Sequence, residues 1–292
     1  MDWKTRQVGD ILRNALLEDR AIQDATTQAC IEAQQKAVGV VLAKQACVLA
    51  GLGAVGRTLE IFGELHGAVT AVPDVTCNQE IFDGVRVSKG QQVAVVRHEA
   101  RAILSCERVI LNLLQRLSGI ATATRRYVDE ISGTKARLLD TRKTVPGLRV
   151  LDKYAVTCGG GFNHRLDLSD GVLIKNNHIA LAGGVAPALE RARRNRRGEQ
   201  PIEIEVRSLA ELEEALQHGA EAVLLDNMTP DDCRRAVERV QCHTRRVPLE
   251  ASGGITLQNV RAYAEAGVDF ISIGALTHSV HAVDLSMRLQ ML

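Results

Sequence analysis

Basic side chains and a histidine gather in three short segments of a chain whose formal net charge is only +1. The segments are residues 140–149, Asn163-His164-Arg165 and residues 173–178. Clustered positive charge in a nearly neutral protein predicts a site for a small polyanion, because scattered basic residues would only be solvated. Arg142 and Arg165 can each hold a carboxylate or phosphate through two parallel hydrogen bonds, whereas Lys143 and Lys175 act as point charges.

Two glycine-containing segments, Ser252-Gly253-Gly254-Ile255 and 274–278, follow apolar runs late in the chain. Backbone N–H groups can approach an anion closely at glycine, and the start of a helix adds a favourable dipole. Either segment alone could be a plain tight turn, but barrel enzymes often bind phosphate in the loops after their last two strands. We therefore predict a phosphate site here, with the first loop opening directly into a helix.

Glu205 and Asp226 each end an apolar run. Carboxylates in such positions can bind sugar hydroxyls or hydrated magnesium. Helix capping and a structural ion pair are the alternatives. Glu203 shares a face with Glu205 but lies farther from the end of its strand, so Glu205 is the better candidate. Asp140 is expected to orient a neighbouring arginine, and His164 beside Arg165 is expected to donate to a carboxylate.

From residue 136 onward, short apolar runs alternate with helical stretches, and each run ends in polar residues. Ser208 with Glu211, and Thr229 followed by Pro230, are typical helix starts. This alternation predicts an α/β barrel, in which active-site residues follow the carboxyl ends of parallel strands. The apolar runs are 138–139, 172–174, 202–204, 223–225, 247–249 and 270–273.

The chain before residue 113 lacks this alternation of apolar runs and helical stretches. We therefore predict a separate α/β domain at 1–112 and a barrel at 113–279. The last residues, 280–292, are expected to pack back on the first domain. A long helix is expected at 100–131, broken or bent near Gly119. Other expected elements are helices at 8–19 and 59–65, strands at 38–49, 68–72, 84–87 and 92–97, and a hairpin turn at 88–91.

Composition excludes several classes of protein. No apolar run approaches the roughly 20 residues of a membrane span, and the first residues lack the apolar core of a signal peptide. Seven cysteines, an odd number without a Cys-x-x-Cys pair, are typical of buried thiols in the cytoplasm. The balanced charge argues against a nucleic-acid partner, and the arginines at 191–197 are interpreted as a solvated helix end. Gly51–Gly56 fits the dinucleotide pattern, but the hairpin expected downstream does not continue such a domain.

The chain resembles the quinolinate phosphoribosyltransferase family, the type II phosphoribosyltransferases also called nicotinate-nucleotide pyrophosphorylases, over nearly its whole length. The resemblance is strongest in the following motifs: Glu107-Arg108, residues 117–122, 140–144, 146–149, 153–156, 158–161, Asn163-His164-Arg165, 174–175, 177–179, 225–227, 250–255 and 273–277.

The resemblance implies an N-terminal α/β sandwich domain, a C-terminal TIM-like α/β barrel of seven strands, and a homodimer, leaving open whether dimers form hexamers. Arg142, His164, Arg165 and Lys175 would surround quinolinate, and Arg108 would reach the partner subunit's site. Lys143, Glu205 and Asp226 would serve phosphoribosyl pyrophosphate (PRPP) and Mg²⁺, the metal being held by Glu205 and Asp226 directly or through water. The 5-phosphate would lie against Ser252, Gly253, Gly254, Gly274 and His278. Asn176 departs from the acid that the family usually has there.

The reaction so implied is attack of the quinolinate nitrogen on C1 of the ribose, loss of pyrophosphate, and decarboxylation to nicotinate mononucleotide in NAD biosynthesis. Glu205 and Asp226 would favour an oxocarbenium-like transition state, and Lys143 or Lys175 is the expected proton donor. Three alternatives stay open: a relative with another acceptor, such as nicotinate, or with a molybdenum-associated role; a dinucleotide-dependent oxidoreductase; and a barrel that binds a phosphosugar without transferring it.

Overall fold

The computed structural model describes residues 1–67, 72–243 and 245–292, which form two compact units. The N-terminal unit comprises Met1–Arg125, Thr144–Gly160 and Thr277–Leu292, and the barrel unit comprises Arg126–Lys143 and Gly161–Leu276. These divisions fall at residues other than those we predicted, since the long helix α4 (Ala100–Glu130) runs through residue 112 without a break. Whether 1–112 and 113–279 fold as independent domains stays a prediction.

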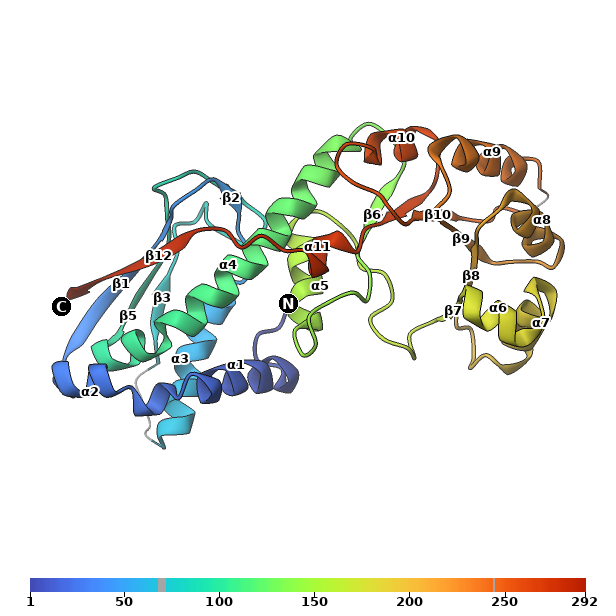
Figure 1. Ribbon diagram of the computed structural model, residues 1–292. Helices are drawn as coiled ribbons and strands as arrows, with labels where there is room; N and C mark the ends of the chain where they lie inside the picture. The colour runs from blue at the N-terminus through green and yellow to red at the C-terminus, as the bar shows by residue number, and fades with distance from the viewer. Residues whose placement is uncertain (68–71, 244) are drawn as a thin grey trace. The chain divides into compact units, whose positions relative to one another are not determined.

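The N-terminal unit is built on a four-stranded antiparallel sheet in the order β12-β1-β5-β3 (Figure 1). β1 (Lys36–Ala43) lies between β5 (Gln92–Glu99) and β12 (Leu285–Met291), so the last strand of the chain pairs with the first. β3 (Asp74–Thr76) forms the other edge by pairing with β5.

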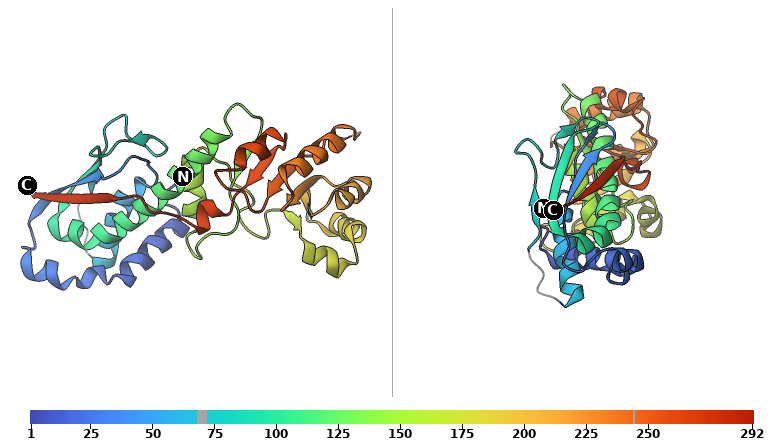
Figure 2. Two further views of the ribbon diagram at one scale, coloured as in Figure 1. Left: turned by 45° about the horizontal axis from the view of Figure 1, so that its top comes forward. Right: turned by 90° about the vertical axis from the view of Figure 1, so that its left-hand side faces the viewer.

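One face of this sheet is buried by helices. Ala37, Gly39, Val41 and Ala43 are buried, while the residues between them are partly exposed. At Gly39 a methyl group would lie only 3.3 Å from Ile103 of α4, so glycine lets helix and strand approach closely. Figure 2 shows the strands and helices of this unit from two further sides.

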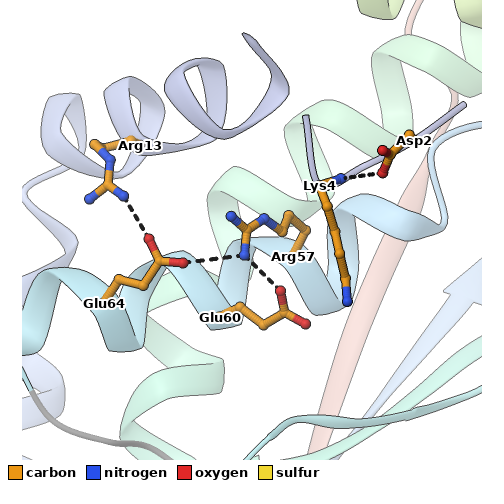
Figure 3. A network of polar contacts seen from close by, with 6 residues as sticks. All are labelled: Asp2, Lys4, Arg13, Arg57, Glu60 and Glu64. Carbon is orange, nitrogen blue, oxygen red and sulfur yellow. Dashed lines mark hydrogen bonds and ion pairs between the residues drawn. The ribbon is translucent and has the colours of Figure 1, made fainter. Parts of the chain in front are cut away.

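The helices α1 (Arg6–Glu18) and α3 (Gly53–His66) are linked by one ion pair of a surface network, whose other pairs lie within α3 (Figure 3). Arg13 pairs with Glu64 at 2.6 Å, and Arg57 pairs with Glu60 at 2.8 Å and with Glu64 at 3.3 Å. Such exposed pairs contribute little to stability, so burial of Leu12, Leu16 and Leu59 is the main force joining these helices.

Two expectations for this unit are wrong. The turn at 88–91 exists, with the Gln91 N–H donating to the Ser88 carbonyl, but the strands on either side of it do not pair as a hairpin. β4 (Arg86–Val87) pairs instead with β2 (Cys47–Val48). The helix α4 is not broken at Gly119, where the absent side chain makes room for the carbonyl of His281, and a bend there stays a prediction. The strand expected at 68–72 falls mostly outside the described residues.

The barrel unit contains a parallel sheet in the order β6-β11-β10-β9-β8-β7. Phe162 forms an isolated parallel bridge with Leu139, so a seventh extended segment lies beside β6. The predicted α/β fold is thus confirmed, with the seventh segment reduced to a bridge. The strands are β6 (Arg137–Leu139), β7 (Val172–Ile174), β8 (Ile202–Val206), β9 (Ala222–Asp226), β10 (Leu249–Ser252) and β11 (Phe270–Ser272).

Helices follow the strands as the sequence pattern predicts (Figure 1). The Ser208 hydroxyl accepts the Glu211 N–H, and the Thr229 hydroxyl accepts the Asp232 N–H, which confirms both predicted helix starts. The helices of this unit are α6 (Asn176–Ala182), α7 (Val185–Asn195), α8 (Leu209–Gln217), α9 (Pro230–Gln241) and α10 (Val260–Glu265). The remaining short elements of the chain are η1 (Ala21–Gln23), α2 (Ala25–Cys30), α5 (Arg149–Cys158) and α11 (Ala275–His278).

Among the described residues, no helix combines the length and the apolar character needed to cross a membrane.

Candidate active site at the carboxyl ends of the barrel strands

The strand register brings the predicted polar residues to one edge of the parallel sheet. Ser252 pairs with Asp226 on one side and with Ser272 on the other, and Ser272 pairs with Leu139. Because the strands are parallel, the segments that leave them also start at this edge. These segments begin at Asp140, Lys175, Arg207, Asn227, Gly253 and Ile273.

Asp140 links the first two cationic segments. Its side chain is fully buried, and its Oδ1 accepts the backbone N–H of His164 at 2.9 Å. The backbone of Asp140 also donates to the Phe162 carbonyl at 3.0 Å. Asp140 therefore fixes the backbone next to Arg165, a contact that the sequence did not reveal when we expected it to orient an arginine side chain.

His164 lies between two carboxylates inside the barrel. Its Nε2 is 3.2 Å from Glu203 and 3.4 Å from Glu250, and its Nδ1 accepts the Arg165 N–H at 2.7 Å. Burial alone would lower the pKa of this imidazole, but the hydrogen bonds to Glu203 and Glu250 raise it to about 10.

The N–H of Arg165 opposes full protonation of the His164 ring, because it occupies the place of a hydrogen on Nδ1. Burial and the Glu250 charge raise the pKa of the Glu203 carboxyl. We therefore place the ring hydrogen on Nε2 and the second proton on the carboxylate pair. The net charge is −1 in either arrangement. His164 thus supports Arg165 and the carboxylates, and its expected contact with the substrate stays a prediction.

Arg142 and Arg165 lie close enough to repel each other. Burial lowers the pKa of the Arg165 guanidinium, and the charge of Arg142 lowers it further. Arg165 donates to the Gly171 carbonyl at 3.1 Å, while the buried Nε of Arg142 has no hydrogen-bond partner among the described residues. Two guanidinium groups held together without a carboxylate on Arg142 favour a bound anion with more than one charge.

Arg207 joins the two predicted carboxylates, and sequence reasoning missed it. It lies 3.1 Å from Asp226 and 3.6 Å from Glu205. Arg207 follows Glu205 by two residues, and side chains at that spacing along an extended strand point to the same face. This spacing is a signal that could have identified Arg207. Oxygen donors of this kind fit Mg²⁺, and a bound cation there would replace Arg207 as the counter-charge.

The glycine loop after β10 is shaped by Asn227. Gly253 has φ +93°, and a side chain there would collide with the amide of Asn227. The Asn227 N–H donates to the Ser252 carbonyl at 2.8 Å, and its amide donates to Asp226 at 3.0 Å. The expectation that this loop opens directly into a helix is wrong, because α10 begins only at Val260 after a turn that Asn259 stabilises.

The other predicted residues are spread over both units. Lys175 and Lys143 are exposed, and the backbone N–H of Lys175 donates to His178 Nδ1 at 2.9 Å. Gly274 precedes α11. Arg108 is exposed on α4, and His278 contacts the Ser279 hydroxyl at 2.7 Å; both belong to the N-terminal unit.

Comparison with known proteins identifies the family. Residues 24–118 match the profile of the quinolinate phosphoribosyl transferase N-terminal domain, and residues 120–288 match that of the C-terminal domain. The chain belongs to the quinolinate phosphoribosyl transferase family. It is 44% identical over 281 residues to the nicotinate-nucleotide pyrophosphorylase (carboxylating) of Mycobacterium leprae, covering 96% of each chain.

Solved structures of this family have the same fold. NadC from Streptococcus pyogenes aligns with a TM-score of 0.92 and 37% identity, over 100% of this chain and 99% of that one. Human nicotinic acid phosphoribosyltransferase aligns with a TM-score of 0.56 at 14% identity, over 95% of this chain and 73% of that one, which shows only a shared fold.

Proposed function

We propose that this protein transfers the phosphoribosyl group of PRPP to quinolinate and decarboxylates the product to nicotinate mononucleotide, as a step of NAD biosynthesis. The observation that carries the proposal is the pair Arg142 and Arg165, held together in the barrel unit of a quinolinate phosphoribosyl transferase family member. Quinolinate has two adjacent carboxylates, and two neighbouring guanidinium groups match that charge and its geometry.

Quinolinate would be held by Arg142, Arg165 and Lys175. His164 would act mainly by fixing Arg165, because both ring nitrogens are engaged within the barrel unit. We further propose a cytoplasmic homodimer in which Arg108 completes the site of the partner subunit. The seven cysteines are all free, which is compatible with a reducing compartment, but the expectation that they are buried is wrong for Cys30, Cys77 and Cys242, which are exposed.

PRPP would lie along the carboxyl ends of the later strands. Ser252, Gly253, Gly254, Gly274 and His278 would hold the 5-phosphate, and Lys143 would neutralise the pyrophosphate. The glycine loop supports this placement. Gly253 and Gly254 have positive φ angles, which glycine adopts readily, and neither has a side chain that could cover the backbone N–H groups.

Glu205 and Asp226 would hold Mg²⁺ directly or through water. Bound Mg²⁺ would stabilise the charge of the departing pyrophosphate. The carboxylates favour positive charge developing on the ribose ring as its bond to pyrophosphate breaks. Arg207, released from them, would be free to contact the phosphates.

The reaction then follows from the substrate. The ring nitrogen forms a bond to C1 of the ribose while the C1–O bond to pyrophosphate breaks. The nitrogen becomes cationic, so the carbon–carboxylate bond at C2 can break with its electron pair left on C2. A proton adds to C2, and Lys143 and Lys175 are the candidate donors.

The test is an assay of the full chain with quinolinate, PRPP and Mg²⁺, in which pyrophosphate and CO₂ are both measured. We expect the two products in equal amounts, and no pyrophosphate when nicotinate replaces quinolinate. Pyrophosphate release with nicotinate at a comparable rate would indicate the alternative acceptor, and absence of both products would refute the proposal.

Arg142→Ala supplies the matched residue test. Loss of a bidentate partner for an anion costs about 2–5 kcal/mol, so we expect quinolinate affinity to fall by at least tenfold while PRPP affinity changes less. Arg261→Ala, on the exposed surface of α10, is the control. Unchanged quinolinate affinity in Arg142→Ala would contradict the assignment.

The role of Arg108 can be tested by complementation. Arg108→Ala and Arg142→Ala subunits, each inactive alone, should regain activity when mixed, because a mixed dimer would contain one intact site. Failure to regain activity under conditions where subunits exchange would argue against a site shared between subunits.

A further inference from the structure

A second cavity lies within the barrel unit, away from the carboxyl ends of the strands. Its volume is about 530 Å³. Four lining residues, Val172, Ile202, Ala222 and Phe270, are the first residues of their strands, and Pro248 immediately precedes β10. In a parallel sheet these positions lie at the amino ends, opposite the candidate active site. Arg142, Lys175, Glu205 and Asp226 are not among its lining residues, whereas His164 and Arg165 of the candidate active site also line this cavity.

The floor of this cavity is formed by His164, Glu203 and Glu250, and its walls are mostly apolar. Glu250 is only 3% exposed, and its Oε1 has no hydrogen-bond partner among the described residues. A buried carboxylate oxygen without a partner is costly. Because this oxygen is itself closed to solvent, a ligand in the cavity reaches the carboxylate pair through Glu203, whose side chain is 17% exposed.

The charges around the cavity favour a cation. Glu221 also lines it but is neutralised by Arg196 at 2.8 Å, and the charge of the lining Asp170 is offset by that of Arg165, which interacts with it electrostatically. Glu203 and Glu250 share His164 between them, which leaves the cluster with a net negative charge. A single positive group on the ligand would balance it.

A metal ion fits this site less well than an organic cation does. The three groups lie within 4.8 Å of one another, a spacing that suits a divalent ion. However, His164 Nδ1 accepts the Arg165 N–H, so the hydrogen of the neutral ring is on Nε2, the nitrogen that faces the carboxylates. That nitrogen has no lone pair for a metal.

We propose that this cavity is a second small-molecule site, which binds a compact organic cation: an ammonium or amidinium group on a small apolar ring. The positive group contacts Glu203 and balances the charge that Glu203 shares with Glu250, and the ring packs among Val172, Ile202 and Phe270. A pocket of this size, largely apolar with a few convergent polar groups, is typical of small-molecule sites.

Occupancy of the cavity would also affect the acceptor site, an effect that rests on the proposed function. A cation on Glu203 and Glu250 competes with the Nε2 hydrogen of His164, the residue that holds the backbone of Arg165. Binding of the cation in the cavity would therefore weaken binding of quinolinate in the acceptor site. Bound quinolinate would weaken binding of the cation by the same factor.

The test is calorimetric titration of the full chain with benzamidinium chloride, without substrates. We expect one saturable site per chain, at least tenfold weaker in Glu250→Gln and in Ala222→Leu, and unchanged in Glu265→Gln. Ala222→Leu fills the cavity without touching the carboxylates, so the two variants weaken binding for different reasons. Glu265 is an exposed acid on α10 and serves as the control.

No saturable binding, or binding that both cavity variants leave unchanged, would overturn the site. Zn²⁺ binding that Glu250→Gln abolishes, without benzamidinium binding, would replace the organic cation by a metal and also overturn it.

A quinolinate titration at saturating benzamidinium tests the link to the acceptor site. We expect the affinity for quinolinate to fall severalfold and then to change no further as more benzamidinium is added. If benzamidinium instead abolished quinolinate binding completely, the two would compete for one place, and benzamidinium would lie in the active site. Because benzamidinium binding is measured without turnover, an inactive protein that binds it would refute the proposed function and leave this site standing.

Discussion

Replacing Asp152 by asparagine should destabilise the N-terminal unit strongly. Asp152 is fully buried at the start of α5 and accepts two hydrogen bonds from Arg116, at 2.9 and 2.8 Å. Its Oδ2 also accepts the Val145 N–H at 3.3 Å, and Arg116 reaches the Thr277 carbonyl at 3.2 Å. One ion pair therefore holds α4, α5 and two segments that enter this unit from the barrel.

The magnitude follows from what asparagine can replace. Hydrogen bonds to charged groups each contribute about 1.5–3 kcal/mol, and asparagine keeps only one of the two oxygens and none of the charge. Water reaches Arg116, whose side chain is 22% exposed, and partly compensates. We expect the free energy of unfolding to fall by about 2–4 kcal/mol.

The single tryptophan makes the measurement local. Trp3 packs edge-on against Tyr154 of α5, with ring centroids 5.9 Å apart, so its fluorescence should report unfolding of this unit. Urea titrations of wild type, Asp152→Asn and Asp10→Asn would be compared. The control lies in the same unit, removes an exposed pair with Arg6 and should change stability by less than about 1 kcal/mol. An equally small change in Asp152→Asn would refute the reasoning.

Three further predictions concern the barrel unit. Arg207→Gln should lower PRPP affinity severalfold in a binding assay yet change the unfolding free energy by less than about 1 kcal/mol, because its side chain is 52% exposed; unchanged PRPP affinity would exclude a phosphate contact. Gly253→Ala should reduce PRPP affinity far more than Gly133→Ala, which has a similar φ of +78° but open space around it; equal losses would show that backbone strain alone is responsible. Burial would raise the pKa of Asp269, but hydrogen bonds from Leu249 and Lys135 outweigh it and hold the pKa below its usual range. Its stabilisation is present above about pH 3.9 and is lost as the pH falls through the lower, folded-state pKa. The difference in Tm between wild type and Asp269→Asn should therefore shrink in acid, and a constant difference from pH 7 to pH 3 would contradict this.

The barrel could be predicted because each strand is marked by an apolar run and each helix by its own start signal. The caps at Ser208 and Thr229 depend only on neighbouring residues, so the sequence alone identifies them. The failures in the N-terminal unit are of another kind. Pairing of β4 with β2 and approach of His281 to Gly119 join residues far apart in the chain, and no local pattern records such contacts.

The candidate site shows the same division. Residue type and position near strand ends led us to predict Arg142, Arg165, Glu205 and Asp226 as site residues. The hydrogen bonds of His164 could not be foreseen, because they depend on which side chains of two separate strands, β8 and β10, face this residue. Arg207 was overlooked although its spacing from Glu205 was a usable signal.

The pairing of β1 with β12 has a consequence for synthesis in the cell. β1 emerges from the ribosome early, but its neighbour β12 emerges only after every strand of the barrel unit. Until then the growing polypeptide has an unpaired edge rich in valine, which invites association with other nascent chains. Maturation of the N-terminal unit must therefore wait for the ribosome to pass Met291, and we expect shielding by a chaperone to raise the yield of native protein.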